Sequence, residues 1–183
     1  MRFDTNVLAR VYRLAERELE RGDTGQKNRL IETLATVIMG YGHVSEMERV
    51  YAADMMRRLG GMSYLESLKR RPETLLKAPH EDIFSTVFVG QATEDVVRGE
   101  RVHTRTVSDV ERKRAGSRAL QEALERAGVY NQIFDIVENT AFTTEEVIER
   151  LEALSERNHG HESVIDQVLN EIQMGAVPRR RER

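Results

Sequence analysis

Four helix start signals recur along this chain, and they constrain its fold more than any other feature. At a helix start, a serine or threonine and a glutamate three residues later each accept a hydrogen bond from the other's backbone N–H group. Apolar residues spaced three and four apart follow these pairs, and glycines stand near the ends of most of these segments. The sequence therefore predicts an all-α protein. The pairs are Ser45 with Glu48, Ser63 with Glu66, Ser108 with Glu111, and Thr143 with Glu146.

The first 76 residues are predicted to form an antiparallel helical bundle. Apolar residues repeat at helical spacing over residues 7–21, 26–39, 45–59 and 63–71, and the loops between these segments are short. The second segment has apolar residues on more than one face, so we expect it at the centre of the bundle. A group of methionines in this part favours core filling, with a partner-binding groove as the alternative. They are Met39, Met47, Met55, Met56 and Met62.

The helical pattern loosens over residues 77–107, which we interpret as a connector. A short helix after Pro79, or a small hairpin in the alternating segment VRGERVHTRTV, fits this stretch. Two separate helices are expected after it, over residues 108–128 and 131–138. Gly128 is predicted to end the first of them, because glycine is the usual residue at the carboxyl end of a helix.

Residues 108–178 are predicted to form a C-terminal helical module, and a basic tail follows over residues 179–183. The last two helices of the module read FTTEEVIERL and, after a loop, ESVIDQVLNEIQMGAV. This order over residues 130–177 resembles the winged helix-turn-helix superfamily. The resemblance implies that the third helix lies in the major groove of DNA. Its outward face would carry His161, Glu162, Ser163, Asp166, Gln167 and Asn170.

The predicted nucleic-acid-binding residues are polar side chains of that third helix and arginines of the tail. Amide side chains bond adenine edges, and arginines contact phosphates. Three acidic residues on the same helix, Glu162, Asp166 and Glu171, oppose phosphate binding. Because the net charge is −3 and the pI is near 6.0, any binding of nucleic acid must be confined to a local patch. The predicted set is His161, Ser163, Gln167, Asn170, Arg179, Arg180, Arg181 and Arg183.

A metal site is the one catalytic arrangement that the sequence suggests. The chain has no cysteine, so ligands would come from imidazole and carboxylate groups. Glu149 and Glu152 resemble the Glu-x-x-Glu pair of helical nucleotide pyrophosphohydrolases that bind magnesium. Glu162 and Asp166 depart from the second pair of that family, because they are four residues apart instead of three. The candidate ligands in the loop and the two helices are His159, His161, Glu162, Asp166, Glu149 and Glu152.

Three functional hypotheses follow from these patterns. We expect a non-enzymatic regulatory protein without metal or cofactor, whose C-terminal module and tail associate with nucleic acid while the N-terminal bundle binds a protein partner or itself. The alternative is a purely structural helical protein that forms homo-oligomers or part of a larger particle. A metal-dependent hydrolase is the third. No segment is apolar enough to span a bilayer and the first residues do not read as a signal peptide, so we expect a cytoplasmic protein.

Overall fold

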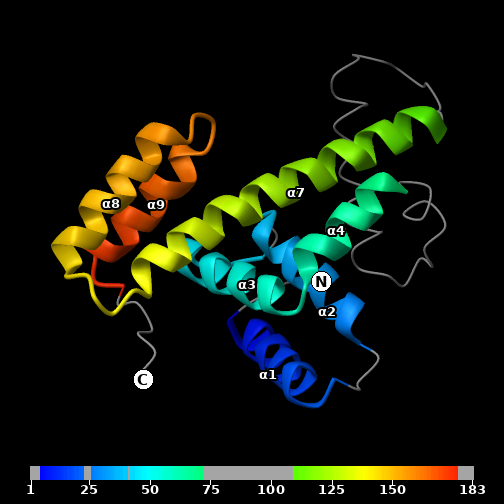
Figure 1. Cartoon of the computed structure of the whole chain (residues 1–183), viewed down its shortest axis with the longest axis horizontal. Coiled ribbons are helices and arrows are strands. Elements are labelled where there is room, and N and C mark those ends of the chain that lie inside the picture. The colour runs from blue at the N-terminus through cyan, green and yellow to red at the C-terminus, as the bar shows by residue number, and fades with distance from the viewer. Residues whose placement is uncertain (1–4, 23–25, 41, 72–108, 177–183) are drawn as a thin grey trace.

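The computed structural model describes residues 5–22, 26–40, 42–71 and 109–176. Within these ranges every regular element is an α-helix, which confirms the predicted all-α class (Figure 1). The helices are α1 (Thr5–Arg21), α2 (Lys27–Ile38), α3 (Glu46–Arg58), α4 (Gly61–Arg70), α7 (Asp109–Val137), α8 (Thr144–Arg157) and α9 (Glu162–Gln173).

Several predicted features lie outside the described residues. They are the short helix or hairpin of the 77–107 connector, the basic tail over 179–183, and its four predicted phosphate contacts Arg179, Arg180, Arg181 and Arg183. Among the helices that the structure does describe, none is both long enough and apolar enough to cross a membrane.

Helix α2 lies at the centre of the N-terminal half, as its apolar pattern predicts. Its nine residues from Leu30 to Ile38 are all buried. Helices α1, α3, α4 and α7 all pack against it. The hydroxyls of Thr33 and Thr36 donate to the carbonyl oxygens of Arg29 (2.8 Å) and Glu32 (2.9 Å), so these polar groups are satisfied inside the core. Burial of α2 on every side accounts for the apolar residues around its whole circumference.

Helix α7 runs diagonally through the molecule and joins its two halves (Figure 1). It packs against α3 and α4 along its length, and α8 packs near its carboxyl end. The prediction of two separate helices here is wrong, because Gly128 continues the helix and does not end it. The buried side chains of Val129, Tyr130 and Ile133 extend the apolar face past the glycine. Their packing outweighs the cost of about 1 kcal/mol that glycine carries inside a helix.

The prediction that Ser63 and Glu66 open the fourth helix is wrong, because α4 begins at Gly61 and both residues lie inside it. Gly60 precedes it with a positive φ of 79°, a conformation that glycine adopts without strain. The backbone at Gly61 approaches α2 and α3 so closely that a Cβ there would lie 2.8 Å from the carbonyl oxygen of Met56. The two glycines therefore make a tight corner between α3 and α4.

Two other sequence interpretations are confirmed by the structure. Thr143 and Glu146 form the predicted reciprocal cap of α8, with N···O distances of 2.8 and 3.3 Å. The methionines of the N-terminal half mainly fill the core, as their apolar positions indicate. Met39, Met47, Met55 and Met56 are buried, and Met62 is half-buried against the same core.

Candidate interaction surfaces

The outward face of α9 carries the polar side chains that were predicted to contact nucleic acid. Ser163, Gln167 and Asn170 are exposed, and His161 is half-buried in the position before the helix. The exposed carboxylate of Asp166 lies on the same helix, and α9 contains no lysine or arginine. Because phosphate contacts need cations, this helix alone lacks the groups that supply affinity for a nucleic-acid backbone.

Glu171 does not lie on that solvated face, contrary to the sequence interpretation. It is half-buried, and its carboxylate accepts hydrogen bonds from the backbone N–H groups of Glu46 (2.8 Å) and Met47 (2.9 Å). Those two residues form the first turn of α3, where N–H groups have no partner within the helix and the helix dipole favours an anion. The carboxylate therefore fastens α9 to the start of α3.

A buried polar hub lies next to this contact. The guanidinium of Arg49 pairs with Glu46 (Nε to Oε1, 3.1 Å) and donates to the carbonyl oxygens of Val37 and Gly42, the latter at 3.2 Å. The hydroxyl of Tyr130 donates to the other carboxylate oxygen of Glu46. Burial, followed by the negative charge of Glu46, raises the pKa of the Tyr130 phenol above its ordinary value. The hub joins α2, α3 and α7, and the side chains of Arg49 and Glu46 are only 8 % and 16 % exposed.

The loop between α8 and α9 does not assemble the predicted metal ligands. The side chain of Glu162 turns back to the loop, where it lies 3.3 Å from Nδ1 of His159 and accepts from the N–H of Gly160 at 2.7 Å. The backbone N–H groups of Glu162 and Gly160, and then His159, hold the pKa of the Glu162 carboxyl below its usual range. Asp166 instead accepts from Ser155 at 3.4 Å. Nowhere in the described ranges do three histidine or acidic side chains converge as metal ligands.

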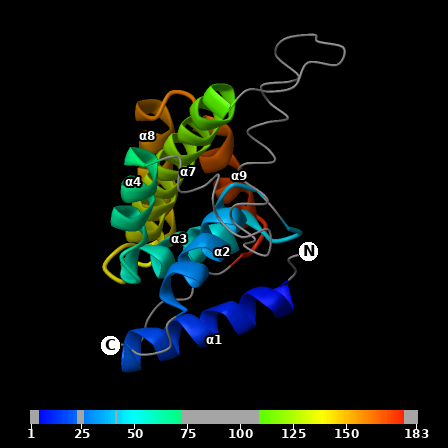
Figure 2. The same ribbon diagram turned by 90° about the vertical axis from the view of Figure 1, so that its right-hand side faces the viewer.

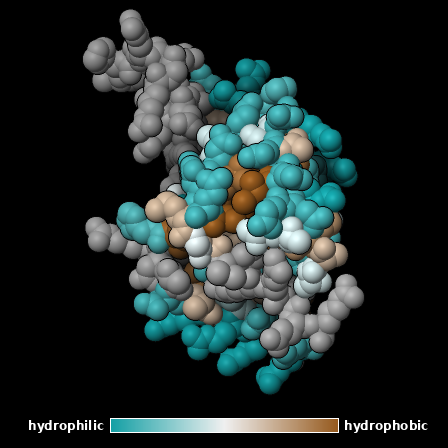
Figure 3. Space-filling model, turned by 90° about the vertical axis from the view of Figure 1, so that its left-hand side faces the viewer, coloured by the Kyte–Doolittle hydropathy of each residue, from teal (hydrophilic) through white to brown (hydrophobic). Residues whose placement is uncertain are grey.

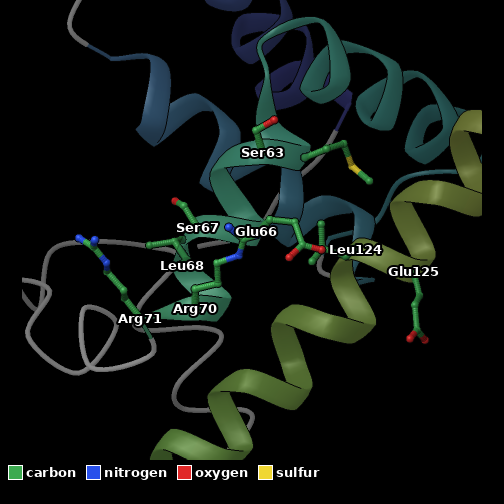
Figure 4. A pocket seen from close by; sticks show the side chains of 9 residues that line it. Ser63, Glu66, Ser67, Leu68, Arg70, Arg71, Leu124 and Glu125 are labelled. Atoms are coloured by element: carbon green, nitrogen blue, oxygen red, sulfur yellow. The ribbon is translucent and has the colours of Figure 1, made fainter.

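A hollow of about 1050 Å³ opens between α4 and α7, and Figure 4 shows the side chains around it. The labelled charged groups do not converge on one point, because Arg71 and Glu125 extend in different directions (Figure 4). A site for chemistry needs groups within hydrogen-bond reach of one reacting atom. The hollow offers no such arrangement in the described residues. Its lining is Met62, Ser63, Glu66, Ser67, Leu68, Arg70, Arg71, Leu124 and Glu125.

Helix α1 carries a row of four exposed arginines along one face, which we call the arginine row. Their spacing of three, four and four residues places them within about 80° of the helix circumference, at 100° per residue. Among the described residues no ion pair involves them, and the guanidinium of Arg13 bonds only the carbonyl oxygen of Ala9. The row consists of Arg10, Arg13, Arg17 and Arg21.

Helix α8 carries a matching row of four exposed glutamates, which we call the glutamate row. Their spacing of four, three and four residues places them within about 60° of the helix circumference. No described residue forms an ion pair with any of them. The row consists of Glu145, Glu149, Glu152 and Glu156. Sequence reasoning missed both rows, although the repeat of like charges at helical spacing was a usable signal.

The two rows lie on helices at different sides of the molecule, and the glutamate row belongs to a strongly acidic segment of the chain. Figures 1 and 2 place α1 and α8 on different sides of α3. Residues 143–176 contain eight acidic residues and two arginines, a net charge of 2 − 8 = −6. Residues 1–142 contain 22 basic and 22 acidic residues and are neutral overall, and residues 177–183 carry 4 − 1 = +3.

The acidic region also has an apolar patch. Figure 3 shows this patch, surrounded by hydrophilic side chains, on the side of the molecule where α8 and α9 lie. The half-buried apolar residues of these two helices include Ile148, Leu154 and Val164. Contiguous apolar surface rimmed by charge is typical of a surface that binds another protein.

No family model, curated protein or solved structure matches this chain.

Proposed function

We propose that this chain is a non-enzymatic helical protein that assembles with further copies of itself. The observation that carries the proposal is the strongly acidic surface of residues 143–176, with a net charge of −6, together with the four exposed arginines that α1 carries on a different side of the molecule. A molecule with an acidic surface on one side and a local row of arginines on another attracts a second copy in a fixed orientation, because complementary potentials steer and orient association. The apolar patch on the acidic side supplies surface whose burial stabilises such a contact (Figure 3).

Sedimentation velocity of the full chain tests this proposal. At low ionic strength the mass should exceed the 21.0 kDa of the monomer and should rise with protein concentration. The mass should fall toward the monomer value at high salt, because exposed charges more than a Debye length apart are screened, and that length is about 3 Å at 1 M salt. A single 21.0 kDa species at low salt over the whole concentration range would rule the proposal out.

Association with nucleic acid is the second candidate function, and the exposed arginine row on α1 favours it. Arginines along one helix face form the kind of local patch that contacts phosphates. In this proposal the row and the basic tail make the backbone contacts, and Gln167 and Asn170 on α9 face the bases. Anisotropy titration with random duplex DNA should then give an affinity that falls steeply with salt, and truncation of residues 179–183 should reduce the slope. Absence of binding at low salt would eliminate this candidate.

A further inference from the structure

We infer that the glutamate row of α8 docks on the arginine row of α1 in a second copy of this chain. This inference rests on the proposed self-assembly and names the two surfaces that form the contact. Each row has four charged side chains, all exposed, on a single helix. Because α1 and α8 lie on different sides of α3, the two rows cannot meet within one molecule (Figures 1 and 2).

The two rows match in length and in spacing. Arg10 to Arg21 and Glu145 to Glu156 each span eleven residue steps, which is about 16.5 Å at the helical rise of 1.5 Å. The charged residues are spaced by three, four and four positions on α1 and by four, three and four positions on α8. Three of the four charged positions therefore coincide when the two helices lie side by side, and the remaining one is offset by one residue. The α8 spacing is the same in both directions, so the match is equally good whether the helices pair parallel or antiparallel.

The charged groups of both rows are exposed, and within the described part of the chain none of the eight side chains has an ion-pair partner. The nearest cation on α8, Arg150, lies over the ring of Phe142 at 3.9 Å and on a different face from the glutamates. The exposed side chain of Leu14, which is 40 % exposed beside the arginines, adds an apolar contact to the charged row.

A protein surface fits the arginine row better than a nucleic-acid backbone does. Glu16, Glu18 and Glu20 on α1 reduce the net charge of that helix to 4 − 3 = +1. Phosphates along a duplex would approach the exposed carboxylates of Glu16 and Glu20 as well as the arginines, since the backbone presents one charge per about 1.7 Å. A single row of glutamates on one helix face, in contrast, places its negative charges only opposite the arginines and not opposite the carboxylates of α1.

The pairing is heterologous, because α1 and α8 lie on different sides of each copy, so the two rows of one molecule do not face the same neighbour. One copy offers α8 to a second copy, and the α8 of that second copy remains available for a third. Such head-to-tail contacts close into a ring or extend into a filament, depending on the rotation between neighbours. The inference therefore predicts a series of species larger than a dimer.

Charge reversal of the two rows in the full chain tests this inference. Arg13→Glu with Arg17→Glu makes α1 acidic, and Glu149→Arg with Glu152→Arg makes α8 basic. Each double variant should weaken self-association by roughly 100-fold in sedimentation experiments, because like charges then face each other across the contact. An equimolar mixture of the two double variants should recover assembly, since each reversed row finds a complementary row on the other protein. The quadruple variant should recover it as well.

Matched controls separate this inference from a general effect of charge. Arg112→Glu with Arg114→Glu changes the net charge equally at two exposed positions on α7 and should leave the mass distribution unchanged. If the wild type assembles and both double variants assemble equally well, the pairing of the rows is overturned, but the proposed self-assembly is not. A wild type that stays monomeric would instead overturn the proposed function. Loss of duplex DNA binding in the α1 variant, without any change in mass, would assign the arginine row to nucleic acid.

Cross-linking gives an independent readout, because the chain has no cysteine of its own. Leu14→Cys lies beside the arginine row, and Ala153→Cys lies beside Glu149 and Glu152 on α8. Under mild oxidation, a mixture of the two single variants should give a disulfide-linked product containing one of each. Val110→Cys, at a residue that is 58 % exposed on α7, serves as the control and should link to neither. Equal linking of all three cysteines would contradict a specific contact between the rows.

Discussion

The carboxylate of Glu171 in α9 accepts a hydrogen bond from the backbone N–H group of Glu46, the first residue of α3, although 125 positions separate the two residues along the chain. Its second oxygen accepts the N–H of Met47. One side chain therefore satisfies two of the N–H groups that a helix leaves without partners at its start. This contact, together with the packing of α9 on α3 and of α8 on α7, holds the α8–α9 hairpin against the rest of the molecule.

Replacing the Glu171 carboxylate should destabilise the fold. We expect Glu171→Gln to lower the free energy of unfolding by about 1–2 kcal/mol, because an amide keeps one acceptor and loses the charge that favours the helix start. Urea denaturation followed by circular dichroism measures the change. The control is Glu66→Gln, at an exposed position of α4, which should change the value by less than about 0.5 kcal/mol. Equal effects of the two variants would show that the cap is not an important contact.

The guanidinium of Arg49 should be irreplaceable by an ammonium group. It bonds Glu46 and the carbonyl oxygens of Val37 and Gly42 in three directions, and lysine has no planar fork to reach all three. We expect Arg49→Lys to lower the free energy of unfolding by about 2–3 kcal/mol, since buried acceptors are left unpaired. Arg58→Lys, at an exposed position on the same helix, should be nearly neutral in the same urea titration. A similar small loss in both variants would contradict the role of the hub.

Local sequence signals predict the helices well where a cap or an apolar pattern acts over a few residues. The reciprocal cap of Thr143 and Glu146 and the fully buried α2 are both confirmed. The same local rules are wrong at Gly128, because the side chains that carry α7 past it are held by helices distant in sequence. Glu171 was misplaced for the same reason, since its partner is the start of α3.

The charged rows illustrate what the sequence alone cannot decide. The spacing of Arg10, Arg13 and Arg17 is visible in the sequence, but a charged helix face is usually solvated, so spacing alone does not indicate a contact. Their meaning depends on exposure, on the lack of partners and on the presence of a complementary row at another side of the molecule. These are properties of the tertiary fold, and local patterns contain no information about them.

Tyr130 should make the protein sensitive to alkali. Burial and the charge of Glu46 raise the pKa of its phenol in the folded state, whereas the unfolded chain has the ordinary value of about 10. The stabilisation from the protonated phenol is therefore fully present below about pH 10 and is lost as the pH rises toward the folded-state pKa. The free energy of unfolding should fall by up to about 1.4 kcal/mol per pH unit in that range.

The Tyr130→Phe variant isolates this contribution, because the chain's other tyrosines remain in both proteins. It should lack the Tyr130 part of the alkaline decline, and its ultraviolet titration should lose one phenol that ionises above the ordinary pKa value. At pH 7 it should be less stable by about 1–2 kcal/mol, since an oxygen of Glu46 loses its donor. Identical slopes of stability against pH for the variant and the wild type would contradict the raised pKa.

Two glycines in helices should respond to alanine in opposite directions. At Gly61 a Cβ would collide with the side chain of Met56 and would lie 2.8 Å from its carbonyl oxygen and 3.1 Å from Cγ2 of Ile31. We expect Gly61→Ala to lower the free energy of unfolding by about 1–3 kcal/mol, because α3 and α4 must move apart. At Gly128 nothing lies within 4 Å of the new Cβ. Gly128→Ala should therefore stabilise the protein by about 0.5–1 kcal/mol, as alanine does inside a helix.

The pair of glycine variants also tests whether α7 is continuous, and thermal and urea unfolding of both provide the measurement. If α7 ended at Gly128, that glycine would adopt a left-handed conformation, and alanine there would destabilise the chain. A gain in stability for Gly128→Ala therefore requires helical backbone on both sides of the position. The expected loss of stability in Gly61→Ala shows, in the same experiment, that alanine destabilises the protein where two helices are in close contact. A loss of stability at both positions would mean that the helix predicted to end at Gly128 does end there.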